Sequence, residues 1–315
     1  MRKNEVATRE AYGQALVELG AEFPEIVVLD ADLSKSTMTA KFAAAYPDRF
    51  FNMGIAEANM MGVAAGLAAS GKIPFASTFA VFATGRAFDQ VRQSIGYPGL
   101  NVKIAASHAG VTVGADGASH QSIEDIALMR TIPGMTVIVP ADASETREAC
   151  RAAVLHRGPV YLRLGRQPTP VLREKWGFQI GRATQLRDGT DVTIVACGVM
   201  VNVSLQAATL LEDEGISAEV LNMSTLKPLD ITALLEAARR TGALVCAEEH
   251  STIGGLGSAV SQYLASEYPV PVKCVGIRDS FGQSGSAAEL MEFYGLTPQA
   301  VAKAAVEAVG MKRRK

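Results

Sequence analysis

The sequence has few cysteines, no excess of either charge and no long apolar run. Its 315 residues carry a net charge of −2, so no broad basic surface is available for nucleic acid or an anionic membrane. No uninterrupted apolar stretch is long enough to span a bilayer, and the amino-terminal residues contain no apolar signal core. Cys150, Cys197, Cys246 and Cys274 are far apart and form no C-x-x-C pair. We therefore expect a soluble cytoplasmic protein with free, buried thiols and neither disulfides nor a zinc site.

Phosphate-binding fingerprints are also missing or incomplete. No G-x-x-x-x-G-K-[ST] motif occurs in the sequence. Gly254-Gly255-Leu256-Gly257 is half of a dinucleotide fingerprint, but Val260 stands where a third glycine is required. We expect these glycines to let a helix start close to a sheet, and we discount a nicotinamide cofactor.

What the chain does have is a regular alternation of apolar, β-branched runs with helical patterns. Hydrophobic residues make up 48% and charged residues 20%, so a large core can form. Near-continuous apolar strands separated by helices indicate a parallel sheet that is covered on both faces. The strand-like runs are 26–29, 102–105, 136–139, 192–195, 218–221, 243–247 and 272–276, and helical segments include 39–46 and 57–69. In such sheets ligands bind beyond the carboxyl ends of the strands.

The alternation lapses once, between about residues 166 and 190, where Pro168, Pro170 and Trp176 fall in a polar stretch. We predict a first domain over residues 1–166, a linker over 167–190 and a second, smaller domain over 191–315. The fold class is α/β, with each domain built on a mainly parallel sheet covered by helices.

Glu57 is the first candidate for chemistry, in the run 51–62 that reads F-N-M-G-I-A-E-A-N-M-M-G. The ordinary interpretation is a carboxylate in a first helical turn, stabilised by the helix dipole. Its neighbours are nearly all small or apolar, and a carboxyl in such surroundings retains its proton unusually well. This property suits a group that shares a proton with a ring nitrogen.

The segment 107–121 is the second candidate and contains two of the four histidines, His108 and His120, with Asp116 between them. It follows a predicted strand, so it should lie at the ligand edge of the sheet. A metal site built from the three side chains fits no usual ligand spacing, and a plain polar surface loop is the other alternative. We favour a substrate site in which histidines exchange protons with sugar hydroxyls near neutral pH.

Phe79 and Phe82 form the third candidate, in the segment 77–86. They lie one helical step apart at the end of a predicted strand. Core packing is the default for such a pair, and an aromatic platform for a flat heterocycle is the functional alternative.

The order and spacing of these three segments, with Asp30-Ala31-Asp32-Leu33 and the run 163–167 (R-L-G-R-Q), resemble transketolase. The similarity is to its carboxyl-terminal half, the pyrimidine-binding domain plus the terminal domain, over essentially the whole chain. It implies a thiamine-diphosphate-dependent transferase that moves a two-carbon ketol unit from a ketose phosphate to an aldose phosphate in the pentose phosphate pathway.

The resemblance also implies site residues. For the cofactor, Glu57 matches the glutamate that hydrogen-bonds N1′ of the aminopyrimidine. Phe82 matches the aromatic ring that stacks on the aminopyrimidine, with Phe79 beside it. Asp32 matches a residue on the loop at the cofactor side. For the substrate, His108 and His120 match histidines that contact substrate oxygens, and they join Glu57 as catalytic residues. The other implied substrate-binding residues are Asp116, at the sugar C2 hydroxyl, and Arg9, Ser36 and Arg166, at the sugar phosphate.

Two departures from the family lie near the sugar and the pyrimidine. The usual loop G-E-D-G-P-T-H-Q-P is replaced at 114–122 by G-A-D-G-A-S-H-Q-S, which changes positions 115 and 118 to alanine. Gly85 stands where an aromatic residue is expected. These changes bear on substrate preference more than on the cofactor.

The sequence contains no Gly-Asp-Gly run, the signature with which this family holds the cofactor diphosphate through Mg²⁺ or Ca²⁺. We therefore expect no metal ligands in this chain and a separate amino-terminal subunit that carries them, in an α2β2 heterotetramer with the active site at the seam.

Three alternatives remain open. The β chain of 2-oxo-acid dehydrogenase complexes shares the domain plan and the glutamate, but His108 and the run 120–124 look more like transketolase. The carboxyl half of 1-deoxy-D-xylulose-5-phosphate synthase fits Glu248-Glu249-His250, although it carries Asp-Arg-Ala-Gly where this chain has S-H-A-G at 107–110. A non-catalytic scaffold subunit is the third. We interpret His250 as a structural or interface residue.

Overall fold

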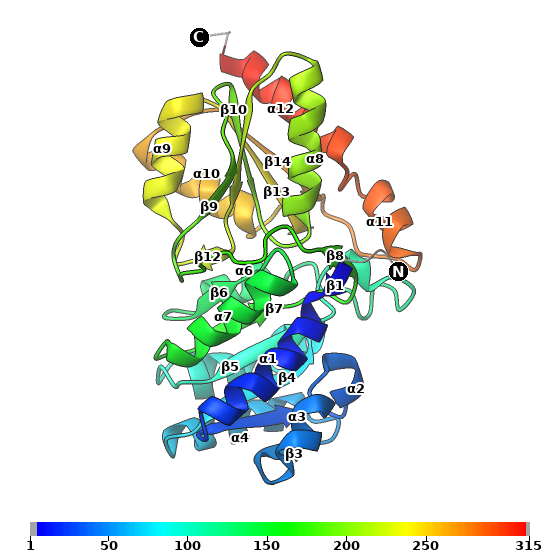
Figure 1. The fold of residues 1–315 in the computed structure, drawn as a ribbon, viewed down its shortest axis with the longest axis vertical. Helices are drawn as coiled ribbons and strands as arrows, with labels where there is room; N and C mark the ends of the chain where they lie inside the picture. Colours follow the sequence, from blue (N-terminus) through cyan, green and yellow to red (C-terminus); the bar gives the residue numbers. More distant parts are fainter. Residues whose placement is uncertain (1–4, 313–315) are drawn as a thin grey trace.

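The computed structural model describes residues 5–312, which form two α/β units stacked end to end (Figure 1). The lower unit in this view holds the amino-terminal part of the chain, and the upper unit holds the second half. Each has a mainly parallel sheet with helices on its faces, which confirms the predicted fold class. Residues 1–4 and 313–315, the outermost ends of the two predicted domains, lie outside the described range.

The first sheet has seven strands in the order β12-β6-β7-β5-β4-β2-β3. Six of them run parallel, namely β2 (Ile26–Asp30), β3 (Phe50–Asn52), β4 (Ile73–Phe79), β5 (Lys103–Ser107), β6 (Thr136–Ile138) and β7 (Val160–Arg163). The predicted strands at 26–29, 102–105 and 136–139 are confirmed as β2, β5 and β6, with small shifts at their ends.

The helices of this unit cover both faces of the sheet. Alternate side chains of β2 point to opposite faces and so show which helices lie on each. α1 and α7 cover the face of Ile26 and Val28, while α4 and α6 cover the face of Val27 and Leu29. The elements are α1 (Thr8–Glu22), α2 (Ser34–Thr37), α3 (Ala40–Ala45), α4 (Glu57–Ala69), α5 (Phe88–Gln90), α6 (Asp125–Thr131), α7 (Ala143–Leu155), the 3-10 turns Pro47–Arg49 and Val111–Val113, and the π-helical turns Phe82–Arg86 and Val91–Gly96.

The second sheet has five strands in the order β14-β13-β10-β11-β9. The parallel members are β10 (Val192–Ala196), β11 (Ala218–Asn222), β13 (Leu244–Ser251) and β14 (Val272–Ile277), which confirms all four runs predicted for this part of the chain. Its helices are α8 (Met200–Asp213), α9 (Ile231–Thr241), α10 (Leu256–Glu267), α11 (Ala287–Phe293) and α12 (Pro298–Lys312).

Three short strands tie the chain together in ways that the sequence pattern does not reveal. β8 (Pro168–Pro170) pairs with β1 (Glu5–Ala7), and β9 (Thr184–Arg187) adds an antiparallel edge to β11. The segment 167–190 is therefore partly regular structure, although its role as a boundary stays a prediction. β12 (Thr225–Lys227) leaves the second unit and pairs with β6 of the first. Strands this short carry too little periodicity to be recognised in a sequence.

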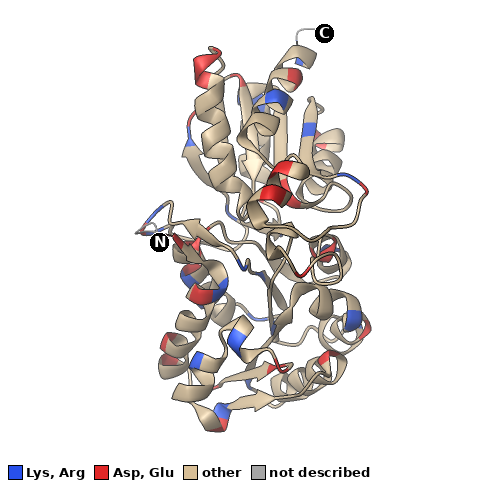
Figure 2. Cartoon of the chain, turned by 90° about the vertical axis from the view of Figure 1, so that its right-hand side faces the viewer, with Lys and Arg blue, Asp and Glu red and all other residues tan. Residues whose placement is uncertain are grey.

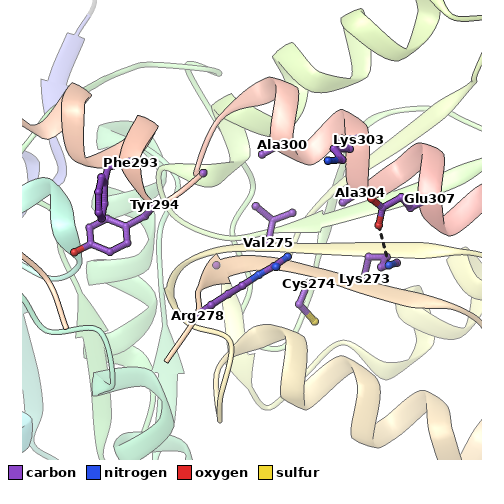
Figure 3. A pocket seen from close by; sticks show the side chains of 12 residues that line it. Lys273, Cys274, Val275, Arg278, Phe293, Tyr294, Ala300, Lys303, Ala304 and Glu307 are labelled. Atoms are coloured by element: carbon purple, nitrogen blue, oxygen red, sulfur yellow. Dashed lines mark ion pairs between the residues drawn. The ribbon is translucent and has the colours of Figure 1, made fainter. Parts of the chain in front are cut away.

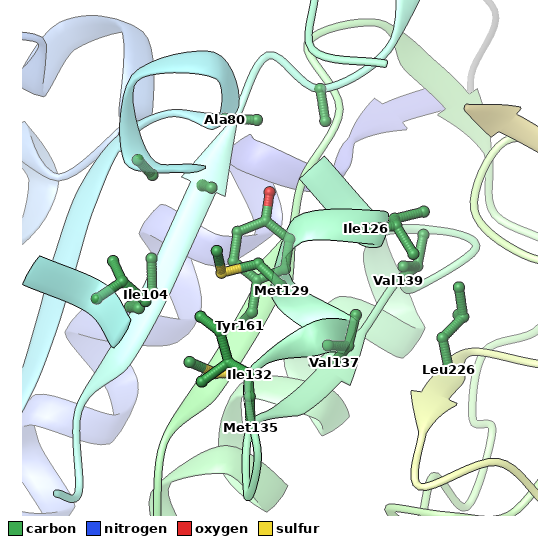
Figure 4. Close-up of a cluster of buried hydrophobic side chains, with 14 of the residues drawn as sticks. Ala80, Ile104, Ile126, Met129, Ile132, Met135, Val137, Val139, Tyr161 and Leu226 are labelled. Carbon is green, nitrogen blue, oxygen red and sulfur yellow. The ribbon is translucent and has the colours of Figure 1, made fainter. Parts of the chain in front are cut away.

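The interface between the units is continuous with their cores. Leu226 of β12 packs in the same buried cluster as Met129, Val137 and Val139 (Figure 4). A buried ion pair lies beside it, in which Arg163 Nε donates to Asp125 Oδ2 at 2.7 Å, and Arg163 Nη2 also donates to the Glu249 carbonyl of the second unit at 3.0 Å. These contacts hold the two units in one arrangement.

Charges of both signs are distributed over both units (Figure 2), in keeping with the net charge of −2. Within residues 5–312, no helix is both long and apolar enough to cross a membrane. All four cysteines are free, as predicted, with three buried and Cys274 half-buried.

Candidate active site

Glu57 is the first residue of α4 and only 2% of its side chain is exposed. Its Oε1 accepts a hydrogen bond from Arg86 Nη1 at 2.9 Å, and the arginine itself is 52% exposed. From the sequence we expect apolar surroundings for this carboxyl group. The structure corrects this, because the cationic side chain of Arg86 contacts it. The sequence places Arg86 twenty-nine residues away, so only the fold brings the two side chains together.

The two phenylalanines stack where β4 ends. The ring centroids of Phe79 and Phe82 are 5.8 Å apart with an interplanar angle of 11°. Phe79 is buried and Phe82 is half-buried, so Phe82 presents the accessible ring. The Arg86 guanidinium lies 4.3 Å from the centroid of Phe82 and thus links the ring to Glu57.

Both predicted histidines lie against this pair. His108 follows β5 with φ 58° and stacks on Phe79 at a centroid distance of 3.8 Å. His120 approaches Phe82 edge-on at 5.4 Å. In each case a serine hydroxyl contacts the imidazole Nδ1 of the next residue at 2.9 Å, Ser107 for His108 and Ser119 for His120. Nε2 of each ring is therefore the nitrogen left to face a ligand.

The electrostatic surroundings change what His108 can do. Burial first, and then the nearby charges of Arg9, Arg166 and His120, lower the pKa of His108 from 6.5 to about 3. The ring is consequently neutral at pH 7. A buried imidazolium beside two arginines is unfavourable, so the role predicted for His108 at substrate oxygens, which stays a prediction, would use the neutral ring.

The residues expected at the sugar phosphate converge on the same surface. Arg9 Nη1 donates to the Ser36 carbonyl at 2.7 Å, so Ser36 contributes its backbone rather than its hydroxyl to this contact. Arg166 Nη1 donates to the Val113 carbonyl at 2.7 Å and to Asp116 Oδ1 at 3.2 Å. Both arginines act on the pKa of His108, which puts them beside that ring.

Asp32 lies apart from this cluster. It has φ 63°, its side chain is exposed, and Oδ1 accepts from Asn52 Nδ2 at 3.0 Å. Its position after β2 is at the same sheet edge, but this hydrogen bond does not join it to Glu57 or the histidines. Among residues 5–312, no group of three or more His, Cys, Asp or Glu side chains converges as a metal site.

The second unit contacts residues 107–121, the segment predicted to bind substrate and therefore called the substrate loop. Glu249 Oε1 accepts from Thr112 N at 2.7 Å, and a Cβ added to Gly110, which has φ 80°, would overlap the Glu249 carboxylate. Glycine at 110 therefore permits both the backbone conformation and the close contact. Nothing in the sequence pattern assigns Glu249 to this loop.

A second support is the bracing segment, residues 279–286. Gln121 Nε2 donates to the carbonyls of Gly114 at 3.0 Å and Gln283 at 2.9 Å, and Ser284 Oγ donates to the Ala115 carbonyl at 2.8 Å. The loop that carries Asp116 and His120 is thus fixed by the terminal unit. Because Gln283 is 162 residues away along the chain from Gln121, sequence spacing gives no signal of this contact.

The glycine run after β13 is also explained by packing. Glu248 Oε2 accepts from Leu256 N at 2.7 Å and Oε1 from Gly257 N at 2.8 Å, so a carboxylate of the chain occupies the start of α10. A dinucleotide phosphate would need the same donors. A Cβ at Gly255 would overlap the Glu248 carboxylate, which confirms that the glycine is needed for close packing. His250 is buried beside it and accepts from Ala127 N of the first unit at 3.4 Å.

Comparison with known families agrees with this geometry. Residues 4–171 match the family described as "Transketolase, pyrimidine binding domain", and residues 181–301 match "Transketolase, C-terminal domain". The chain belongs to the transketolase family. The resemblance inferred from the sequence is confirmed.

Separate carboxyl-terminal chains of transketolases are similar to this protein over nearly their whole length. The "Putative transketolase C-terminal section" of Methanocaldococcus jannaschii is 48% identical over 303 residues, covering 95% of each chain. The "6-deoxy-6-sulfo-D-fructose transketolase subunit" of Clostridium sp. strain MSTE9 is 47% identical over 305 residues, covering 96% of this chain and 95% of that one. A solved structure described as "Split gene transketolase, inactive beta4 tetramer" has a TM-score of 0.90 at 59% identity, covering 97% of this chain and 98% of that one.

Proposed function

We propose that this chain is the catalytic carboxyl-terminal subunit of a two-chain transketolase, which moves a two-carbon ketol unit from a ketose phosphate to an aldose phosphate. The observation that carries the proposal is the grouping of Glu57, the Phe79–Phe82 pair, His108 and His120 on one surface at the sheet edge. These residues come from the start of α4, from the end of β4 with the π-helical turn after it, and from the segment 107–121. Core packing alone does not require a buried carboxylate or two histidines there.

The geometry fits the aminopyrimidine of thiamine diphosphate, the cofactor that membership of this family implies. Glu57 offers a nearly buried carboxylate held at one oxygen by Arg86, which suits a hydrogen bond to a ring nitrogen. Phe82 offers a half-buried face on which a flat heterocycle can stack. When bound, the cofactor supplies the carbon nucleophile and the electron sink. Asp32 is proposed to line the loop on the cofactor side.

Glu57 is then the residue that holds a proton between the protein and the cofactor ring. Its burial keeps water away from that hydrogen bond, which strengthens it in the low-dielectric interior. Arg86 holds Oε1 of the carboxylate, which leaves Oε2 as the proposed acceptor for the cofactor ring. This is a positioning role for Arg86, because it contacts Glu57 and Phe82 rather than a reacting atom.

The histidines are proposed to handle the substrate oxygens. His108, neutral at pH 7, acts as a hydrogen-bond partner to a carbonyl or hydroxyl oxygen through Nε2. His120, at the edge of the Phe82 ring, is placed to exchange a proton with a hydroxyl. Asp116 is proposed to accept a hydrogen bond from the sugar C2 hydroxyl.

Arg9, Ser36 and Arg166 form the proposed anion grip at the far end of the sugar. Two guanidinium groups beside one another attract a tetrahedral oxyanion strongly. The Clostridium relative is named for a sulfo-sugar, so the anion here is either a phosphate or a sulfonate. Comparing the turnover of xylulose 5-phosphate with that of a sulfonated ketose decides between them.

We propose that the diphosphate and its Mg²⁺ or Ca²⁺ are held mainly by a separate amino-terminal subunit in a cytoplasmic α2β2 assembly. The support is that the Methanocaldococcus relative is named as a carboxyl-terminal section and the Clostridium relative as a subunit, and that the solved relative is described as an inactive β4 tetramer. Gel filtration of the mixed chains tests the assembly. Thiamine-dependent turnover by this chain alone would refute it.

The central experiment is a ketol-transfer assay with the partner, xylulose 5-phosphate, ribose 5-phosphate, thiamine diphosphate and Mg²⁺. Glu57→Gln keeps the volume of the side chain but removes its charge, and it should lower kcat by a factor of about 10² or more. Unchanged turnover in this variant supports the scaffold alternative instead. Glu248, Glu249 and His250, the residues on which the synthase alternative rests, all have packing roles in the structure.

A further inference from the structure

The terminal unit contains a cavity that the catalytic proposal does not use. It lies between the edge strand β14 and the helices α11 and α12, and its volume is about 550 Å³. This size is within the range of small-molecule sites, roughly 300 to 1,000 Å³. Side chains from all three elements and their adjoining loops line it (Figure 3).

The charges in this cavity are unbalanced. Lys273, Arg278 and Lys303 face a single carboxylate, Glu307. Lys273 Nζ is paired with Glu307 Oε2 at 2.8 Å. The side chains of Arg278 and Lys303 form no hydrogen bond or ion pair with any residue in the described range 5–312, and both residues are exposed. Two cationic groups are thus left over.

These cations lie close enough together to act on one ligand. The bond from Lys273 lowers the pKa of Glu307, and the charges of Lys303 and Arg278 lower it further. All three therefore lie within electrostatic range of the same carboxylate. In Figure 3 the Arg278 side chain runs along β14 toward the Lys273–Glu307 pair, and Lys303 lies above it on α12. The excess of two positive charges matches a dianion.

The remaining walls are apolar or aromatic. Val275, Ala300 and Ala304 line the side next to the cations, and Phe293 exposes 67% of its surface at the other end. An exposed aromatic ring next to a charged cavity is suited to contact the uncharged part of a small molecule. A peptide strand is less well matched, because lysines beside an edge strand discourage strand addition.

We propose that this cavity binds the phosphate dianion of a small molecule, with Arg278 and Lys303 as its principal contacts. An arginine fork donates two parallel hydrogen bonds to such an oxyanion, and a lysine adds a point charge. The site is separate from Glu57 and the anion grip, because its lining comes from β14, α11, α12 and their adjoining loops.

The cavity also adjoins the bracing segment of the substrate loop. Arg278 directly precedes residues 279–286, and Tyr294 Oη donates to the Phe281 carbonyl within them at 2.8 Å. A ligand on Arg278 therefore sits at one end of the segment that fixes the loop of Asp116 and His120. The inference stands independently of the catalytic proposal, since it needs no cofactor and no partner.

Isothermal titration calorimetry of the full chain tests the inference, with inorganic phosphate in one arm and adenosine 5′-monophosphate in the other. Saturable binding in either arm is expected, and the nucleotide should bind more tightly if the aromatic end of the cavity contributes. Arg278→Ala and Lys303→Ala should each weaken binding about tenfold. Glu307→Gln should tighten it, because the competing carboxylate is removed.

Two controls separate this cavity from other cationic surfaces. Lys41→Ala removes one exposed charge from α3 of the other unit, and Lys175→Ala removes one exposed charge from the segment between the two parallel sheets. Both should leave the affinity of this site unchanged. The inference is overturned if neither ligand binds at millimolar concentration, or if the Arg278→Ala/Lys303→Ala double variant binds as tightly as the unaltered chain.

Discussion

The ion pair between Arg86 and Glu57 should stabilise the fold more than an ion pair in which both partners are exposed, although its arginine is half-exposed. Replacing Arg86 by Met keeps the apolar stem over Phe82 and removes the charge. The Glu57 carboxylate, 2% exposed, then loses the partner that compensates its burial. Breaking a fully buried pair costs about 3–5 kcal/mol, and because water reaches the arginine we expect about 1–2 kcal/mol here.

The chain contains a matched control for this effect. Arg151 is also 52% exposed, but its partner Glu22 is 47% exposed. Arg151→Met therefore removes an ion pair whose arginine is as exposed as Arg86, but whose carboxylate remains hydrated. The loss of unfolding free energy should be clearly smaller than for Arg86→Met.

Urea denaturation followed by circular dichroism measures both losses, in parallel with a double-mutant cycle of Arg86→Met and Glu57→Gln. The cycle should give a favourable coupling energy, because the Glu57→Gln side chain no longer carries the charge that Arg86 compensates. Equal destabilisation by Arg86→Met and Arg151→Met, or a coupling energy of zero, would refute the idea that burial of the carboxylate governs this pair.

Further predictions concern the loop and His108. A Cβ at Gly282 would overlap the Gln121 side-chain amide. Gly282→Ala should therefore displace the bracing segment and raise KM in the ketol-transfer assay. Gly310→Ala should not raise KM, because a Cβ at Gly310 would lie in open space. Because the pKa of His108 falls from 6.5 to about 3 on folding, the unfolded chain binds more protons between these values, and stability should drop as pH falls through that window. His108→Asn should flatten this part of the pH–stability curve in urea titrations, and an unchanged slope would contradict the assignment.

Much of the fold could be predicted from the sequence because its central strands are apolar. β2 and β10 are buried along their whole length, and buried parallel strands are nearly continuous hydrophobic runs. Glu57, His108 and His120 could be named as candidates because their segments resemble transketolase and because a carboxylate or imidazole stands out among small and apolar residues. β12 could not, since a three-residue strand that crosses to the other unit carries no period.

The sequence by itself determined the two-domain α/β architecture and the set of candidate side chains, through local pattern and residue type. Only the tertiary structure decided that Arg86 compensates Glu57, that His108 is neutral beside two arginines, and that residues 279–286 brace the substrate loop. Each of these depends on distances between segments far apart in the chain. Burial and electrostatic interaction depend on such distances, and they are set only when the chain has packed.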